Sequence, residues 1–187
     1  AIAIPMMIQK GAGITEANVR PKPGDTVQTE FGGAAASTGL ASPATANGIN
    51  PGNVPTWAEW HDRDDTIDFN NYYGGNVDAI MMHAVTYVSL DEDKVLDIGL
   101  ASDDSVQVLL DGVEIHILSL GRGYGTANTV LDTISSATVA ELNPLTEGIH
   151  EILVKVFEGD GSNGFRLRFQ EPGSPEPVTE GITVCLD

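Results

Sequence analysis

Two adjacent carboxylates, Asp103 and Asp104, stand between two runs of alternating apolar residues. Like charges side by side at the end of a strand repel each other, and a bound cation would offset that repulsion. Calcium takes about six to eight oxygen ligands, and carboxylates on loops are its usual protein ligands. Aspartates are also common turn formers, because their side chains accept hydrogen bonds from nearby backbone N–H groups. The pair therefore predicts either a calcium site or an aspartate-stabilised turn.

A second acidic group lies in the aromatic segment WAEWHDRDDTIDFNNYYGGN, residues 57–76. Its Asp62 and Asp64 are spaced like oxygen ligands on a loop, but the Gly and Glu positions of an EF-hand are missing. Large aromatic side chains either stack on sugar rings or pack at one end of a domain. The candidates for glycan stacking are Trp57, Trp60, Tyr72, Tyr73 and, in the later GRGYG loop, Tyr124.

Catalytic motifs are missing from this sequence. It contains neither a nucleophile elbow nor an HExxH motif. The lone Cys185 lies in a strand-like ITVCL run, where a cysteine usually behaves as a small buried hydrophobe. The four histidines, His61, His83, His116 and His150, are scattered along the chain. The sequence therefore predicts a protein that is not an enzyme.

The charge balance is strongly acidic, with 27 Asp and Glu residues against 9 Lys and Arg and a formal net charge of −18 over 187 residues. Such a surface repels phosphate backbones and anionic lipids, which argues against nucleic acid as a partner. No run approaches the roughly 18 apolar residues of a membrane-spanning helix, so membrane insertion is not predicted. The same charge repels other copies of the chain unless cations neutralise it.

Alternating apolar residues predict an all-β fold. The run 95–117 contains three short apolar alternations, and Asp111-Gly112 between the last two is a strong two-residue hairpin signal. Further strands are expected within 79–88, 130–142, 148–157, 165–169 and 182–186. The segments 148–157 and 165–169 read as a hairpin-like pair, in which Phe165, Leu167 and Phe169 face inward and Arg166 and Arg168 face outward. We expect an antiparallel, jelly-roll-like β-sandwich over residues 51–187.

Residues 1–50 are predicted to form an extended arm. Residues 1–8 are an apolar strand with Ile2, Ile4, Met6 and Ile8 on one side, and a Gly-, Ala-, Ser- and Thr-rich tether follows. Such a comb can add to the open sheet edge of another molecule, where backbone hydrogen bonds give affinity and alternate side chains fill pockets. It can also fold back as an edge strand of its own domain. The chain starts at Ala1 without Met, which fits the removal of a signal peptide and leads us to expect a secreted protein.

The segment from WAEWHDRDD through LASDDSVQVLLDGVEI to GIHEILVKVFEGDGSNGFRLRF resembles a secreted bacterial β-sandwich module over residues 53–172. This module is related to the PA14 and galactose-binding-like jelly rolls. The resemblance implies a calcium site at Asp103, Asp104 and Asp160, with Asn163 as a weaker ligand, and a carbohydrate-binding role. Ser105 replaces the usual Gly of the family, Asn163 the loop Trp and Leu109 a strand Trp.

Two functions follow from these patterns. The first is a non-catalytic structural or adhesive subunit, stabilised by calcium, that builds extracellular filaments or surface layers by donating its N-terminal strand to a neighbouring copy. The second is a calcium-dependent carbohydrate-binding module that recognises cell-surface polysaccharide. The expected partners are thus copies of the chain or a polysaccharide.

Overall fold

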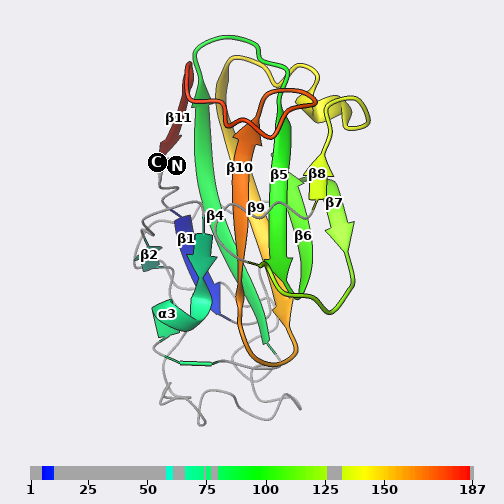
Figure 1. Ribbon diagram of the computed structural model, residues 1–187. Helices are drawn as coiled ribbons and strands as arrows, with labels where there is room; N and C mark the ends of the chain where they lie inside the picture. Colours follow the sequence, from blue (N-terminus) through cyan, green and yellow to red (C-terminus); the bar gives the residue numbers. More distant parts are fainter. Residues whose placement is uncertain are drawn as a thin grey trace.

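The fold is a sandwich of two antiparallel β-sheets (Figure 1). The structure, a computed structural model, describes residues 6–10, 58–60, 66–73, 75–76, 80–125 and 132–185. The predicted all-β antiparallel sandwich is therefore confirmed.

Within the described residues, the larger sheet has seven strands in the order β2-β1-β4-β9-β6-β7, with β11 also paired to β4. Its central strands β4 and β9 are each 11 residues long and pair from Ile80 opposite Glu158 to Leu90 opposite Gly148. The strands are β1 (Met6–Lys10), β2 (Ala58–Trp60), β4 (Ile80–Leu90), β6 (Ser105–Leu110), β7 (Val113–Leu118), β9 (Gly148–Glu158) and β11 (Ile182–Cys185).

Among the described residues, the smaller sheet has four strands in the order β3-β10-β5-β8. They are β3 (Thr66–Asp68), β5 (Asp97–Asp103), β8 (Asp132–Ile134) and β10 (Gly164–Gln170). Of the range 130–142, where a strand is expected, the described residues 132–142 contain the three-residue strand β8 and then a short 3-10 turn, η2 (Ala140–Leu142). A single α-helical turn, α3 (Phe69–Tyr73), follows β3. None of the described helices is long and apolar enough to cross a bilayer.

The core lies between the two sheets, where alternate residues of each strand face inward. Val88 and Val154 of the larger sheet and Leu100 and Phe165 of the smaller sheet are all buried there. The rings of Phe69 and Phe165 pack with centroids 5.9 Å apart. Full burial of a side chain of this size stabilises the fold by about 1.5–3 kcal/mol. The predicted inward positions of Phe165, Leu167 and Phe169 are confirmed.

The run 95–117 forms the three predicted strands, but only two of them are hairpin neighbours. Asp111 and Gly112 have positive φ angles of 49° and 81° and join β6 to β7, so the predicted hairpin is confirmed. By contrast, β5 and β6 belong to different sheets. The turn that carries Asp103 and Asp104 therefore crosses the sandwich from one sheet to the other.

The prediction of a hairpin-like pair for residues 148–157 and 165–169 is wrong. β9 lies in the larger sheet between β4 and β6, whereas β10 lies in the smaller sheet between β3 and β5. Alternation along a strand fixes which side chains face the core, but it does not identify the neighbouring strands. Residues 159–163 thus form a second crossover between the sheets.

The predicted outward position of Arg166 is also wrong, since this side chain is only 6% exposed. Its Nε donates a hydrogen bond to Thr66 Oγ1 at 2.7 Å, and its guanidinium lies over the Tyr124 ring, 5.6 Å from the ring centroid. The outer face of β10 is covered at this point, so a residue on the solvent side of the alternation is buried. Arg168, two residues later, is half-buried.

Two short strands share one edge of β4. β1 pairs with its first half, from Lys10 opposite Met82 to Met7 opposite Val85. β11 pairs with its second half, from Cys185 opposite Tyr87 to Ile182 opposite Leu90. Both run antiparallel to β4, so they lie in line along it (Figure 1).

The predicted N-terminal comb is described only in part. Met6 and Ile8 belong to β1, which begins at Met6 and pairs within its own chain, while Ile2 and Ile4 lie outside the described residues.

His83 of β4 is a buried titratable group on the face opposite the core. It is 3% exposed and stands beside Lys155 of β9 in the register. Among the residues that the structure describes, its Nδ1 has no hydrogen-bond partner. Burial lowers the pKa of His83 to about 4.

We predict that stability falls as the pH drops below the unfolded-state pKa of about 6.5, because only the unfolded chain then binds the extra proton freely. The loss attributable to His83 grows to about 3 kcal/mol by pH 4. Urea unfolding of the parent and of His83→Gln at pH 7, 5.5 and 4.5 measures the free energy of unfolding at each pH. The His83→Gln variant should have a shallower pH dependence, and equal slopes would contradict the prediction.

Candidate metal site

Three carboxylates converge at the end of the sandwich where the chain crosses twice between the sheets. One oxygen each of Asp103, Asp104 and Glu158 lies within 4.8 Å of the other two. Asp103 ends β5, and Glu158 ends β9. The backbone N–H of Asp104 donates to the carbonyl of Phe157 at 3.2 Å, which ties the first crossover to the end of β9. The local fold therefore brings residues more than 50 positions apart into one acidic cluster.

Backbone N–H groups from two glycine-rich loops surround this cluster. Asp104 Oδ1 accepts a hydrogen bond from the N–H of Arg122 at 2.8 Å, and its Oδ2 accepts one from the N–H of Gly159 at 3.0 Å. A Cβ added to Gly159 would lie 3.2 Å from Asp104 Oδ2, a very close approach. Glycine at this position thus lets the second crossover pack directly on the carboxylate.

The electrostatics of the cluster disfavour three separate negative charges. Burial and the neighbouring charge of Asp104 raise the pKa of Asp103 to about 6, although a hydrogen bond from the N–H of Tyr124 acts in the opposite direction. Glu158 is completely buried. A divalent cation would offset the mutual repulsion and stabilise the ionised carboxylates. Hard oxygen ligands of this type suit calcium, with further ligands supplied by backbone carbonyls or water.

The other predicted metal ligands lie apart from this cluster or outside the described residues. Asp160 is exposed and does not belong to the three-carboxylate group. Asn163 is buried, its Nδ2 donates to Met82 Sδ at 3.6 Å, and its carbonyl accepts from the N–H of Phe69 at 2.9 Å. Asp62 and Asp64 are not among the described residues. Glu158 was not identified from the sequence, where it reads as an ordinary polar residue at the end of a strand.

Arg122 links the loop 121–125 to the side of the sandwich between β7 and β8. Its guanidinium lies 2.6 Å from Asp132 Oδ2 and donates to Ser102 Oγ at 2.9 Å. The Ser102 hydroxyl in turn donates to the carbonyl of Asp104 at 2.8 Å. His116 Nε2 lies 3.8 Å from Asp132, and burial is the largest cause of a lowered His116 pKa. These contacts hold the loop over the acidic cluster.

The predicted glycan-stacking residues are only partly described. Tyr124 is half-buried, with its ring against Arg166 and 3.2 Å from the position of a Cβ added to Gly164. Trp60 lies in β2 and Tyr72 and Tyr73 lie in α3, but their side chains, like all of Trp57, are outside the described set. Phe157, which the sequence analysis did not single out, directly precedes Glu158 in the chain and is 42% exposed.

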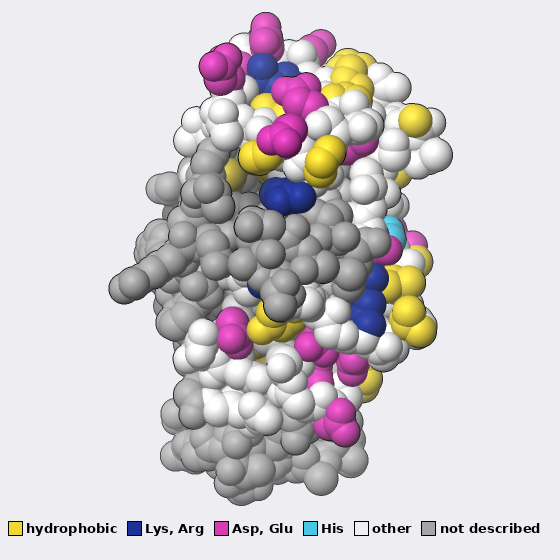
Figure 2. All heavy atoms as spheres, viewed as in Figure 1, with side chains coloured by type: hydrophobic (Ala, Val, Ile, Leu, Met, Phe, Trp, Pro, Cys, Tyr) yellow, Lys and Arg dark blue, Asp and Glu magenta, His cyan; other side chains and the backbone are white. Residues whose placement is uncertain are grey.

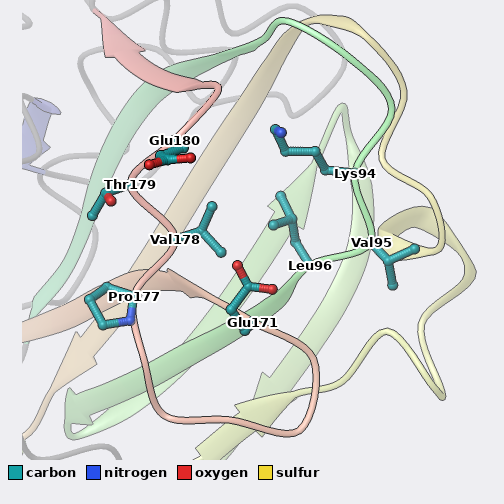
Figure 3. A pocket seen from close by; sticks show the side chains of 8 residues that line it. All are labelled: Lys94, Val95, Leu96, Glu171, Pro177, Val178, Thr179 and Glu180. Carbon is teal, nitrogen blue, oxygen red and sulfur yellow. The ribbon is translucent and has the colours of Figure 1, made fainter.

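A cleft of about 390 Å³ lies at the opposite end of the sandwich, beyond the Leu90–Gly148 end of β4 and β9 (Figure 3). Its lining combines apolar and charged residues and consists of Lys94, Val95, Leu96, Glu171, Pro177, Val178, Thr179 and Glu180. Lys94 Nζ lies 2.9 Å from Glu92 and 3.6 Å from Asp91. Figure 2 shows acidic side chains gathered at this end of the molecule. No residue of this cleft belongs to the predicted site.

Comparison of the chain with protein-family models, with curated proteins and with solved structures finds no match. The resemblance to PA14-like modules therefore stays a prediction, and the candidate site rests on its own geometry.

Proposed function

We propose that the protein is a non-catalytic structural or adhesive subunit that assembles outside the cell by exchanging its N-terminal strand between copies. The observation that carries this proposal is the position of β1. It occupies an edge of β4, and four of its residues are matched to β4 residues. The tract of residues 11–57 separates it from β2, the strand on its other side. A strand with a long connection can pair with the β4 edge of its own chain or with the same edge of a neighbour.

Head-to-tail exchange of this kind does not close on itself. Each copy donates one β1 and offers one β4 edge, so the contacts are heterologous and propagate into a filament. Because the backbone register is identical in both arrangements, exchange costs little in pairing energy. One interaction thus accounts for the alternating apolar residues of the N-terminal segment, for the tether that follows it, and for the β4 edge that receives the strand.

Calcium has a defined part in this proposal. Copies that each carry a formal charge of −18 repel one another, and bound divalent cations reduce that repulsion. Asp103, Asp104 and Glu158 are the residues that would hold the ion. Extracellular calcium modules bind with dissociation constants of about 10⁻⁴–10⁻³ M, which matches the calcium level outside cells.

A disulfide trap tests strand exchange. The register places Ile8 opposite Ala84, and directly opposite residues are close enough for a disulfide bond. One chain carries Ile8→Cys and the other Ala84→Cys, both with Cys185→Ser. We expect that the two chains, refolded together and oxidised, form a disulfide-linked heterodimer on a non-reducing gel.

The control pairs Gln9→Cys with Ala84→Cys, because Gln9 stands opposite His83 and is therefore one position away from Ala84 in the register. A cross-link that forms within an Ile8→Cys, Ala84→Cys double variant but never between mixed chains would refute the exchange.

A specific observation favours calcium-dependent carbohydrate binding as a second candidate. Phe157 directly precedes Glu158 in β9, and its exposed ring lies on the outer face of the larger sheet with Met81 and Ile117, where an aromatic face suits a sugar ring. Polysaccharide binding that disappears with a chelator, in a chain that shows no exchange between copies, would favour this candidate.

A further inference from the structure

Arg166 is a buried charge on the outer face of the smaller sheet. The register places it between Thr66 of β3 and Ala101 of β5, and its side chain is only 6% exposed. Its Nε donates to Thr66 Oγ1 at 2.7 Å, but among the residues that the structure describes its Nη1 has no hydrogen-bond partner. A buried guanidinium is normally paired with an acidic group, because an unpaired buried charge destabilises the fold. Within this part of the chain, Arg166 therefore lacks the partner that its burial requires.

The nearest carboxylates by register do not supply this partner. Asp68 and Asp103 stand opposite Gly164, two residues before Arg166 in β10. The carboxylate of Asp103 belongs to the acidic cluster, and that of Asp68 accepts a hydrogen bond from a backbone N–H of α3. No ion pair between described residues joins either of them to Arg166. The chain has 27 Asp and Glu residues against 9 Lys and Arg, so a shortage of carboxylates does not explain this.

The ring of Tyr124 lies beside the guanidinium. The guanidinium carbon of Arg166 is 5.6 Å from the ring centroid. The ring also packs against the backbone of Gly164, because a Cβ added to that glycine would lie 3.2 Å from Tyr124 Cε1. Tyr124 itself is half-buried and belongs to the surface loop 121–125. The position thus combines a positive charge with an aromatic face.

We propose that Arg166 binds the carboxylate of an acidic sugar, a hexuronate. A planar guanidinium pairs with a carboxylate through two parallel N–H···O bonds, and Nη1 supplies one of them. The Tyr124 ring offers an apolar face to the sugar ring next to that charge. A net charge of −18 repels a singly charged carboxylate less than a doubly charged phosphate. The contacts of Arg122 hold the loop, so the half-buried Tyr124 side chain is the part that moves aside for the ligand.

This inference rests on the carbohydrate-binding candidate for the class of ligand, and it is independent of strand exchange. It names an acidic sugar as the ligand and places the contact on residues outside the three-carboxylate cluster.

Thermal unfolding in sodium glucuronate tests the assignment. We expect the melting temperature of the parent to rise with glucuronate concentration. Glucose, the neutral counterpart, and sodium chloride at equal ionic strength should not reproduce the rise. The chloride control is needed because screening alone stabilises a chain of this charge. Arg166→Lys keeps the charge but loses the planar fork, and it should raise the dissociation constant for glucuronate at least about tenfold.

Arg168→Lys is the matched control for this variant. Arg168 lies two residues later in β10 and is half-buried, and its replacement should leave the glucuronate response unchanged. If Arg166→Lys does not fold, ¹⁵N NMR of the arginine Nε–H groups in the parent gives the same test. Thr66→Val removes the hydroxyl bonded to Arg166 Nε and so identifies its signal. That signal should shift with glucuronate and stay in place with glucose.

The outcomes separate this inference from the proposed function. A glucuronate response no larger than that of sodium chloride, or one that survives in Arg166→Lys, overturns it. A response that appears only after Asp62→Asn, Asp64→Asn and Asp65→Asn identifies a carboxylate of the chain as the partner and also overturns it. Strand exchange is measured separately by the Ile8→Cys and Ala84→Cys cross-link. Chelator-sensitive binding of a neutral polysaccharide measures the carbohydrate candidate itself, so both can stand when the glucuronate site fails.

Discussion

Deletion of residues 1–10 should abolish assembly completely while leaving a folded, monomeric sandwich. The core between the two sheets is formed by residues of β4, β5, β6, β9 and β10, none of which is removed. The truncated chain keeps an open β4 edge from Met82 to Val85 but has no strand to donate. Negative-stain electron microscopy and light scattering of parent and truncated protein at equal concentration measure the effect.

A synthetic peptide of residues 1–10 provides the control for this deletion. Added to the truncated chain, it should bind the open edge and raise the melting temperature without restoring filaments, because a free peptide cannot link two sandwiches. A peptide with Ile4→Asp and Ile8→Asp should not bind. If the truncated chain does not fold even with the peptide present, β1 is an obligatory strand of its own domain and the proposed exchange is wrong.

Addition of 10 mM calcium should raise the melting temperature of the protein by about 3–10 °C. A dissociation constant of about 10⁻⁴–10⁻³ M corresponds to a stabilisation of about 1.4–2.7 kcal/mol at this concentration. For a chain of this size, each kcal/mol shifts the melting temperature by about 2–4 °C. Differential scanning fluorimetry with calcium, magnesium or chelator measures this effect.

The acidic cluster also predicts that the stability of the folded protein depends on pH in opposite directions with and without calcium. The folded-state pKa of Asp103 is raised to about 6, above the ordinary aspartate value of 3.8. Its contribution to stability is therefore fully present below about 3.8 and is lost as the pH rises through 6. In chelator, protonation of Asp103 should thus favour folding between pH 7 and pH 5. With calcium, the ion requires the ionised carboxylates, so acidification should reduce the stabilisation by calcium.

Glu158→Gln is the decisive variant for this site. It removes one of the three carboxylates that would hold the ion, so it should lose most of the calcium response. Asp160→Asn is the matched control, since this exposed residue lies outside the cluster and its loss should leave the calcium response unchanged. An equal calcium shift in Glu158→Gln and in the parent would contradict the assignment.

Features that depend on neighbours in the chain could be predicted from the sequence alone. Period-two alternation indicated the strands and the inward side chains Phe165, Leu167 and Phe169, because successive residues of a strand point to opposite faces. The turn at Asp111-Gly112 was equally local, since two consecutive positive φ angles restrict the residue types. Adjacent aspartates also identified two members of the acidic cluster.

Features that depend on which strands pair were decided only by the tertiary structure. β9 and β10 follow each other in sequence yet lie in different sheets, and this separation places Glu158 beside Asp103 and Asp104. The same pairing buries Arg166 and sets β1 and β11 in line on β4. Alternation is a property of one strand, whereas pairing depends on the free energy of the whole sheet. Contacts between residues far apart in the chain therefore could not be predicted from any local pattern.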